Sequence, residues 1–214
     1  MTLNLSVDEV LSTTRSVRKR LDFDRPVPRE VLMECLELAI QAPTGSNSQG
    51  WQWMFVDDPE KKKAIGEIYL SHARNYLATP AREYPDGDSR GERMGAVRDS
   101  AIYLAERMHE APVLMIPCIE GRDGDSPLGG VSFWASLLPA VWSFCLALRS
   151  RGLGSCWTTL HLVGNGERRA AEVLGIPYDS YSQGGLFPIA YTKGTDFRPA
   201  KRLPAESLTH WNSW

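Results

Sequence analysis

The feature that most constrains this chain is an uncharged stretch from Ser126 to Leu148. The part from Phe133 onward is almost entirely apolar, and such a segment folds either across a membrane or inside a protein core. Pro127 and Pro139, with two glycines between them, interrupt the stretch. The strongly apolar part is also shorter than the roughly 20 residues that a membrane helix needs. We therefore expect a buried central helix and no membrane partner.

Composition and charge describe one globular domain. The 214 residues are 43% hydrophobic, which is enough to bury a core, and 24 basic against 26 acidic side chains leave a net charge of -2. Such a balance gives no bulk attraction for nucleic acid or an anionic membrane surface. We therefore expect a single domain over residues 1–214 without a nucleic-acid partner.

The four cysteines, Cys35, Cys118, Cys145 and Cys156, show no C-x-x-C spacing. Because each has apolar neighbours, we expect buried thiols rather than a disulfide or a metal site. The histidines show no paired metal-ligand spacing either, so the sequence predicts no metal. Reduced cysteines, together with a first segment that lacks a signal-peptide pattern, favour a cytoplasmic protein.

Hydrophobic periodicity predicts more helices than strands. Ser6 and Glu9 form a capping-box pattern at the start of the first helix, and 111–119 is a continuous apolar run typical of a strand buried on both faces. Strands do not alternate regularly with helices, so the fold class is α+β rather than doubly wound. Besides the central helix, the predicted helices are 6–19, 29–41, 59–77, 98–108 and 168–174. The predicted strands are 51–56, 111–119 and 185–191, with a strand or strand-like turn at 155–162.

Residues 80–95 are charged, contain glycines and lack apolar periodicity. A segment with so little apolar surface suits a mobile lid that orders over a bound ligand. Tyr76 and Tyr84 are candidates for stacking on an aromatic substrate, although surface or packing roles fit each of them equally well.

Residues 14–20, where we expect the first helix to end, combine hydroxyl side chains with arginine and lysine side chains. Arg15, Ser16 and Arg18 offer planar guanidinium donors and a short hydroxyl, which a phosphate group needs. On composition alone, a solvated helix end stabilised by the helix dipole is favoured over that interpretation. A nucleic-acid patch is disfavoured because no matching basic stripe exists elsewhere in the chain.

Two further polar segments could contact a heterocycle. The loop at 43–51 joins amide and hydroxyl side chains to glycines that allow close backbone approach, although a plain turn between a helix and a strand fits equally well. Thr158 and Thr159 place two hydroxyls on a strand expected to be buried, which is costly unless they meet polar partners. His161 is interpreted as a packed or surface histidine rather than a ligand or base.

Motifs of several other enzyme classes are absent from the sequence. There is no G-x-S-x-G elbow, Walker A loop or G-x-G-x-x-G after a strand, so hydrolase, P-loop and Rossmann assignments lack support. Five other motifs, in this order, resemble the FMN-dependent nitroreductase family. They are Arg15-Ser-Val-Arg18 followed by Pro26-Val-Pro28, Ala42-Pro-Thr-Gly-Ser-Asn-Ser-Gln-Gly-Trp51, Gly152-Leu-Gly-Ser-Cys-Trp-Thr-Thr159, Leu186-Phe-Pro-Ile-Ala-Tyr191 and Lys201-Arg-Leu-Pro204.

The resemblance implies a three-layer α-β-α sandwich that forms an intertwined homodimer, with FMN at the interface and residues 199–214 as an arm that packs on the partner. It implies an oxidoreductase that uses NADH or NADPH to reduce nitroaromatics, quinones or related small molecules by a ping-pong route. The flavin N5 atom would carry the chemistry, so no catalytic side chain is expected.

The resemblance also assigns cofactor contacts by motif. Arg15, Ser16 and Arg202 would hold the FMN phosphate, and Arg18 would approach the N1/O2 edge of the ring. The residues expected to line the ring are Thr44, Gly45 and Asn47, and those expected to face N5 are Trp157, Thr158 and Thr159.

Some positions depart from the family pattern, namely Thr14, Gly50 and the pair Trp142-Ser143. The sequence also leaves other functions open. One is a narrower flavin reductase or dehydrogenase, such as a reductive dehalogenase. Another is a flavin-binding sensor or store with little turnover, because fold alone does not imply activity.

Overall fold

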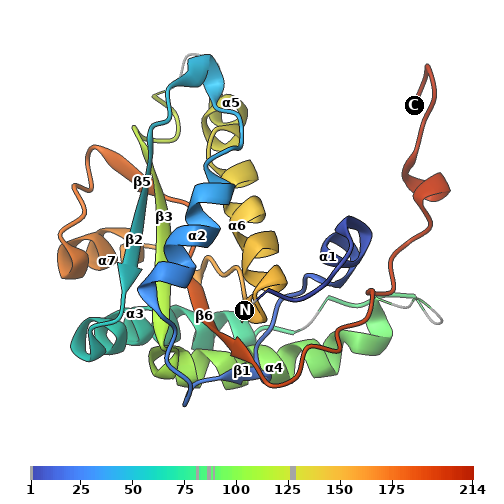
Figure 1. Cartoon of the computed structure of the whole chain (residues 1–214), viewed down its shortest axis with the longest axis horizontal. Coiled ribbons are helices and arrows are strands. Elements are labelled where there is room, and N and C mark those ends of the chain that lie inside the picture. Colours follow the sequence, from blue (N-terminus) through green and yellow to red (C-terminus); the bar gives the residue numbers. More distant parts are fainter. Residues whose placement is uncertain (1, 81, 86–87, 89, 126–128) are drawn as a thin grey trace.

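A central antiparallel sheet lies between two helical layers (Figure 1). The structure, a computed structural model, describes residues 2–80, 82–85, 88, 90–125 and 129–214. The helices are α1 (Val7–Thr13), α2 (Arg29–Ala39), α3 (Pro59–Ala78), α4 (Met94–Arg107), α5 (Gly129–Ala135), α6 (Leu138–Ser150) and α7 (Gly166–Leu174). The strands are β1 (Leu21–Asp22), β2 (Trp51–Val56), β3 (Val113–Glu120), β4 (Leu153–Ser155), β5 (Tyr181–Gln183) and β6 (Phe187–Thr192). Short 3-10 helices are η1 (Gly45–Asn47), η2 (Gly91–Arg93), η3 (Met108–Glu110), η4 (Leu160–Leu162) and η5 (Ala205–Leu208).

Strands β3 and β6 organise the sheet. The order is β1-β6-β3-β2, with β4 paired to β6 and β5 paired to β3. Ile189 of β6 pairs with Val113 of β3 and with Ser155 of β4, so β3 and β4 lie on opposite edges of β6. The two- and three-residue strands β1 and β5 were not predicted, because they are too short to show a period-2 pattern.

Strand β3 separates two apolar clusters. Leu114 and Ile116 belong to the cluster under α3, α4 and α7, whereas Val113 and Met115 belong to the cluster under α2 and α6. Successive side chains of a strand point to opposite faces, so a strand packed on both sides is apolar throughout. This arrangement confirms the three-layer α+β fold and the prediction of a strand buried on both faces.

The central helix differs from its prediction. It is divided into α5 and α6 at residues 136–137, and Pro139 lies in the first turn of α6. Proline is tolerated there because the first N–H groups of a helix have no intrahelical partner. By length and composition Gly130–Ser150 could cross a membrane, but Val141, Phe144 and Leu148 of α6 lie in the core of the sandwich.

The first helix is shorter than predicted. The capping box at its start is confirmed, with the Ser6 N–H donating to Glu9 Oε2 over 2.7 Å and the Glu9 N–H donating to Ser6 Oγ over 3.2 Å. The helix ends at Thr13 rather than at residue 19, because the following residues join the sheet edge. Helix α4 begins at Met94, four residues before its predicted start.

The C-terminal segment extends away from the rest of the chain (Figure 1). Trp211 and Trp214 are 83% and 101% exposed, and Leu208 is 64% exposed. The Trp214 ring stacks on His210, with 4.4 Å between ring centroids, but residues 201–214 are exposed throughout. This segment is therefore free to contact another molecule.

Candidate functional site

The Arg15-Ser-Val-Arg18 segment lies along the edge of β4. Ser16 forms a parallel bridge with Ser155, and the Val17 N–H donates to the Ser155 carbonyl over 2.8 Å. Val17 is buried, whereas Ser16 is exposed and Arg15 and Arg18 are half-buried. The prediction that these residues form a helix end is wrong, because their backbone groups pair with a strand that is distant in sequence.

Three arginines converge beside this edge. Burial lowers the pKa of Arg15, and the nearby positive charges of Arg93 and Arg202 lower it further. Arg15 Nη1 also donates to the carbonyl of Arg198 over 2.7 Å. Like charges this close repel one another unless an anion lies among them, so the cluster fits a phosphate group.

Arg202 was predicted for this cluster, but Arg93 was missed. Arg93 belongs to η2, within the segment that we interpreted as a lid, and no local motif marks it. Its role follows only from the fold. The tail is held near η2 by an ion pair between Lys201 and Glu92, with 3.5 Å between Nζ and Oε2.

Arg18 lies beside the end of β4 and beside α3. Burial raises the pKa of Tyr69 to about 12, and the Arg18 charge acts in the opposite direction. Burial also raises the pKa of the Cys156 thiol, against the effects of Arg18 and the Ser16 hydroxyl. These shared effects place Arg18 near Tyr69 and Cys156.

The segment 157–159 is partly engaged with the protein itself. Trp157 Nε1 donates to the Gly184 carbonyl over 3.1 Å, and Thr158 Oγ1 donates to the Leu186 carbonyl over 2.7 Å. Thr158 therefore uses its hydroxyl proton within the protein, which leaves the exposed Thr159 as the available threonine. The strand expected at 155–162 pairs with β6 only at Ser155; Thr158 then forms an isolated bridge with Leu186, and the chain continues as η4.

The Thr44–Asn47 loop lies at the other end of the sheet. At the end of the loop, the Gly50 carbonyl accepts a hydrogen bond from the Glu120 N–H. Ser16 pairs with Ser155, which pairs with Ile189, and Ile189 in turn pairs with Val113. Ser16 therefore lies level with Val113 across the sheet. Val113 and Glu120 are the two ends of β3, so the groups are separated by roughly 20 Å along the strands. One chain therefore does not bring Thr44, Gly45 and Asn47 together with the arginine cluster.

This loop has an uncommon backbone conformation. Ser46 and Asn47 have φ angles of 51° and 53°, in the left-handed region that non-glycine residues rarely adopt. The Gly45 N–H donates to Ser136 Oγ over 3.0 Å, which attaches the loop to the end of α5. Such strain is common at binding sites, and here it exposes the loop's polar groups.

The two candidate substrate residues lie on different elements, Tyr76 on α3 and Tyr84 beside η2. Tyr76 is two helical turns after Tyr69 on α3 and influences its pKa, so both belong to the same side of the helix. Tyr84 lies between Arg82 and Arg90, whose guanidinium carbons are 5.4 Å and 4.8 Å from its ring centroid. Part of the predicted lid, at 81, 86–87 and 89, lies outside the described residues.

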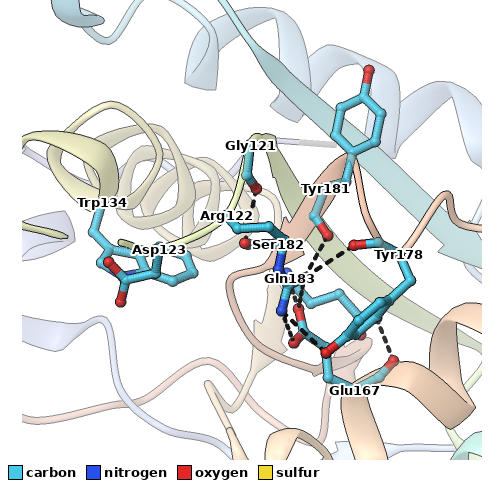
Figure 2. Close-up of polar contacts among 9 residues, drawn as sticks. All are labelled: Gly121, Arg122, Asp123, Trp134, Glu167, Tyr178, Tyr181, Ser182 and Gln183. Carbon is cyan, nitrogen blue, oxygen red and sulfur yellow. Dashed lines mark hydrogen bonds and ion pairs between the residues drawn. The ribbon is translucent and has the colours of Figure 1, made fainter. Parts of the chain in front are cut away.

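A polar network of Arg122, Glu167 and Gln183 joins α7 to β5 (Figure 2). Arg122 Nη2 is 2.7 Å from Glu167 Oε2, and Glu167 Oε1 accepts from the Gln183 N–H over 2.9 Å. These contacts tie β5 to α7. His161 packs here as expected, fully buried, and burial lowers its pKa to about 4, so it is neutral near pH 7.

Cysteine chemistry contributes little to this site. Cys35, Cys118 and Cys156 are buried and Cys145 is half-buried, and all are free thiols. Burial raises the pKa of Cys35 to about 11 and those of Cys118 and Cys145 to about 12. Within the described ranges, no three His, Cys, Asp or Glu side chains are grouped as metal ligands would be.

The three layers define an α+β sandwich whose sheet edge at β4 is lined by arginines. The model of the nitroreductase family matches residues 11–191, and the chain belongs to this family. The protein DrgA of Synechocystis sp. is 28% identical over 193 residues, which cover 88% of this chain and 84% of DrgA.

Solved structures share the fold over nearly the whole chain. Oxidized iodotyrosine deiodinase bound to FMN and 3-iodo-L-tyrosine superposes with a TM-score of 0.72 at 22% identity, covering 98% of this chain and 100% of that one. The FMN- and NADPH-dependent nitroreductase NfnB from a Sphigopyxis strain gives a TM-score of 0.70 at 24% identity, with the same coverage. The family resemblance found in the sequence is confirmed.

Proposed function

We propose that the protein is an FMN-dependent oxidoreductase that takes hydride from NADH or NADPH and reduces small acceptors such as nitroaromatics or quinones. The observation that carries this proposal is the convergence of Arg15, Arg93 and Arg202: Arg15 donates to the Arg198 carbonyl, and Lys201 lies 3.5 Å from Glu92 of η2. When bound, FMN supplies the hydride chemistry at its N5 atom. The protein then needs to bind, orient and shield the ring.

Each polar group has a role that suits its place. The three guanidiniums would hold the doubly charged phosphate, and Ser16 would add a hydroxyl contact. Arg18 would stabilise negative charge at the N1/O2 edge of the reduced ring. Thr159 would donate a hydrogen bond toward N5, because Thr158 already donates to Leu186.

A complete site requires a second copy of the chain. The ring contacts at Thr44, Gly45 and Asn47 lie roughly 20 Å along the strands from Ser16, so they would come from the partner subunit. The exposed segment 199–214 would pack on that partner and cover its apolar side chains. The proposed working unit is therefore a homodimer with two flavin sites. Its free thiols suit a reducing compartment, and we propose the cytoplasm.

The function is tested by flavin analysis and steady-state turnover. Purified protein should be yellow and should release about one FMN per subunit on denaturation. It should oxidise NADH or NADPH with double-reciprocal plots that are parallel across acceptor concentrations, as a ping-pong route requires. An acceptor panel with nitroaromatics, quinones and 3-iodotyrosine separates a broad reductase from a narrower dehalogenase. Flavin without turnover would indicate a sensor or store, and FAD or no flavin would disprove the cofactor assignment.

Substrate choice is expected to depend on residues 76–94, apart from Arg93, rather than on the flavin contacts. The cofactor contacts are shared by every substrate, so discrimination must come from what covers the open ring face. Replacing 83–91 with a Gly-Ser connection leaves Arg93 in place and should change relative rates across the acceptor panel. Flavin content and nicotinamide oxidation should persist. Unchanged relative rates would exclude this segment and direct attention to Trp142 on α6.

A further inference from the structure

A small cavity of about 40 Å³ lies behind the Arg15-Ser16 segment, between the end of α1, helix α6 and strand β4. Two arginines and four hydroxyl side chains line it, together with apolar and aromatic groups, and none of the described residues that line it is acidic. The arginines are Arg15 and Arg149, and the hydroxyl residues are Thr13, Thr14, Ser16 and Ser155. A cavity with this lining has donors and positive charge but no negative charge of its own.

Arg149 is buried in this wall, with 5% of its surface exposed. Its Nε donates to Thr13 Oγ1 over 3.1 Å, and its Nη2 donates to the Thr195 carbonyl over 3.0 Å. The buried Nη1 atom has no hydrogen-bond partner among the described residues, and the same is true of the buried Ser155 Oγ. Two buried polar groups on one cavity without partners indicate a missing ion or water.

Among the described residues, no carboxylate forms an ion pair with Arg149, and its guanidinium carbon lies 5.0 Å from the centroid of the Phe197 ring. The pKa of Arg149 is lowered by burial and by Arg20, and is raised only by Glu9. Arg20 is paired with Asp196, with 2.5 Å between Nη2 and Oδ1, and Glu9 is exposed in the capping box of α1. A guanidinium cannot lose its proton in a protein, so a buried one requires a counter-charge.

We propose that this cavity binds a small halide ion, such as chloride, between Arg149 Nη1 and Ser155 Oγ. The volume admits a monatomic anion with one or two waters, whereas it is far too small for a flavin ring. The cavity shares Arg15 and Ser16 with the proposed phosphate cluster, whereas the buried Arg149 and Ser155 on its inner wall are assigned to no cofactor contact. The halide would neutralise the charge that lies behind the cofactor-binding segment.

The test compares chloride with an anion too large for the cavity, using the flavin-loaded protein. In 0.2 M sodium chloride the melting temperature should be about 3 °C higher than in sodium gluconate of equal ionic strength. The shift should disappear in Arg149→Met and shrink in Ser155→Ala. Arg151→Met is the matched control, because Arg151 pairs with Glu34 outside the cavity and should keep the full shift. A crystal soaked in sodium bromide should show an anomalous peak beside Arg149.

Other outcomes would overturn the proposal. Equal melting temperatures of the wild type in the two salts, with no bromide peak, would mean that the cavity holds water only. A shift retained in Arg149→Met would place the halide elsewhere. A shift seen in the flavin-free protein but abolished by FMN would mean that the cofactor phosphate uses this cavity. If Arg149→Met does not fold, the wild-type comparison and the bromide peak decide. None of these readouts requires turnover, so they are independent of the proposed function.

Discussion

Arg15→Ala is expected to weaken FMN binding about 10- to 150-fold, the equivalent of losing about 1.5 to 3 kcal/mol from a charge-assisted contact. Arg15 is the half-buried member of a three-arginine cluster, so water cannot fully replace it as a phosphate donor. Titration of flavin-free protein with FMN, followed by flavin fluorescence, measures the effect. Riboflavin lacks the phosphate, so its affinity should change much less.

The matched control for this experiment is Arg29→Ala. Arg29 is exposed and pairs with Asp57 over 2.6 Å at the start of α2, away from the cluster. Its loss should leave FMN affinity unchanged. An equal loss of FMN and riboflavin affinity in Arg15→Ala would contradict the phosphate assignment, because it would indicate a general disturbance of the sheet edge.

Local signals in the sequence predicted several elements well. Helix α3 was expected at 59–77 and lies at Pro59–Ala78, because Asp58 caps it and proline occupies its first turn. Helix α2 was expected at 29–41 and lies at Arg29–Ala39. Cap residues and apolar spacing act over a few residues, so a sequence reveals them directly.

Features that depend on distant contacts were not accessible in this way. The apolar and capping pattern near Thr13 does not reveal that Ser16 pairs with Ser155, and this pairing ends α1 early. Arg93 carries no motif, and only the fold brings it to Arg15. The family motifs pointed to most of the candidate site residues. They did not show which of these residues lie close together within a single chain.

Because the proposed site takes residues from two chains, loss of the C-terminal arm is expected to affect both dimerisation and FMN binding. Deleting residues 203–214 is expected to weaken self-association at least about 100-fold and to lower FMN retention. The deleted segment carries Leu208, Trp211 and Trp214, which are exposed in the single chain. Exposed apolar patches of this kind mark protein–protein interaction sites. Arg202 would become the last residue of the chain and would lose the following residues that are expected to hold it in position. Sedimentation velocity and the ratio of flavin to protein absorbance measure the two effects.

A full-length variant separates the loss of these side chains from the loss of the chain itself. Leu208→Ser, Trp211→Ser and Trp214→Ser together keep the length of the arm but remove three of its large apolar side chains. If the arm binds through those groups, the triple variant should dissociate as the deletion does and lose FMN with it, because Thr44–Asn47 would no longer reach the partner's arginine cluster. A triple variant that sediments as a dimer would assign dimerisation to other surfaces, and a monomer that keeps its FMN would disprove the shared site altogether.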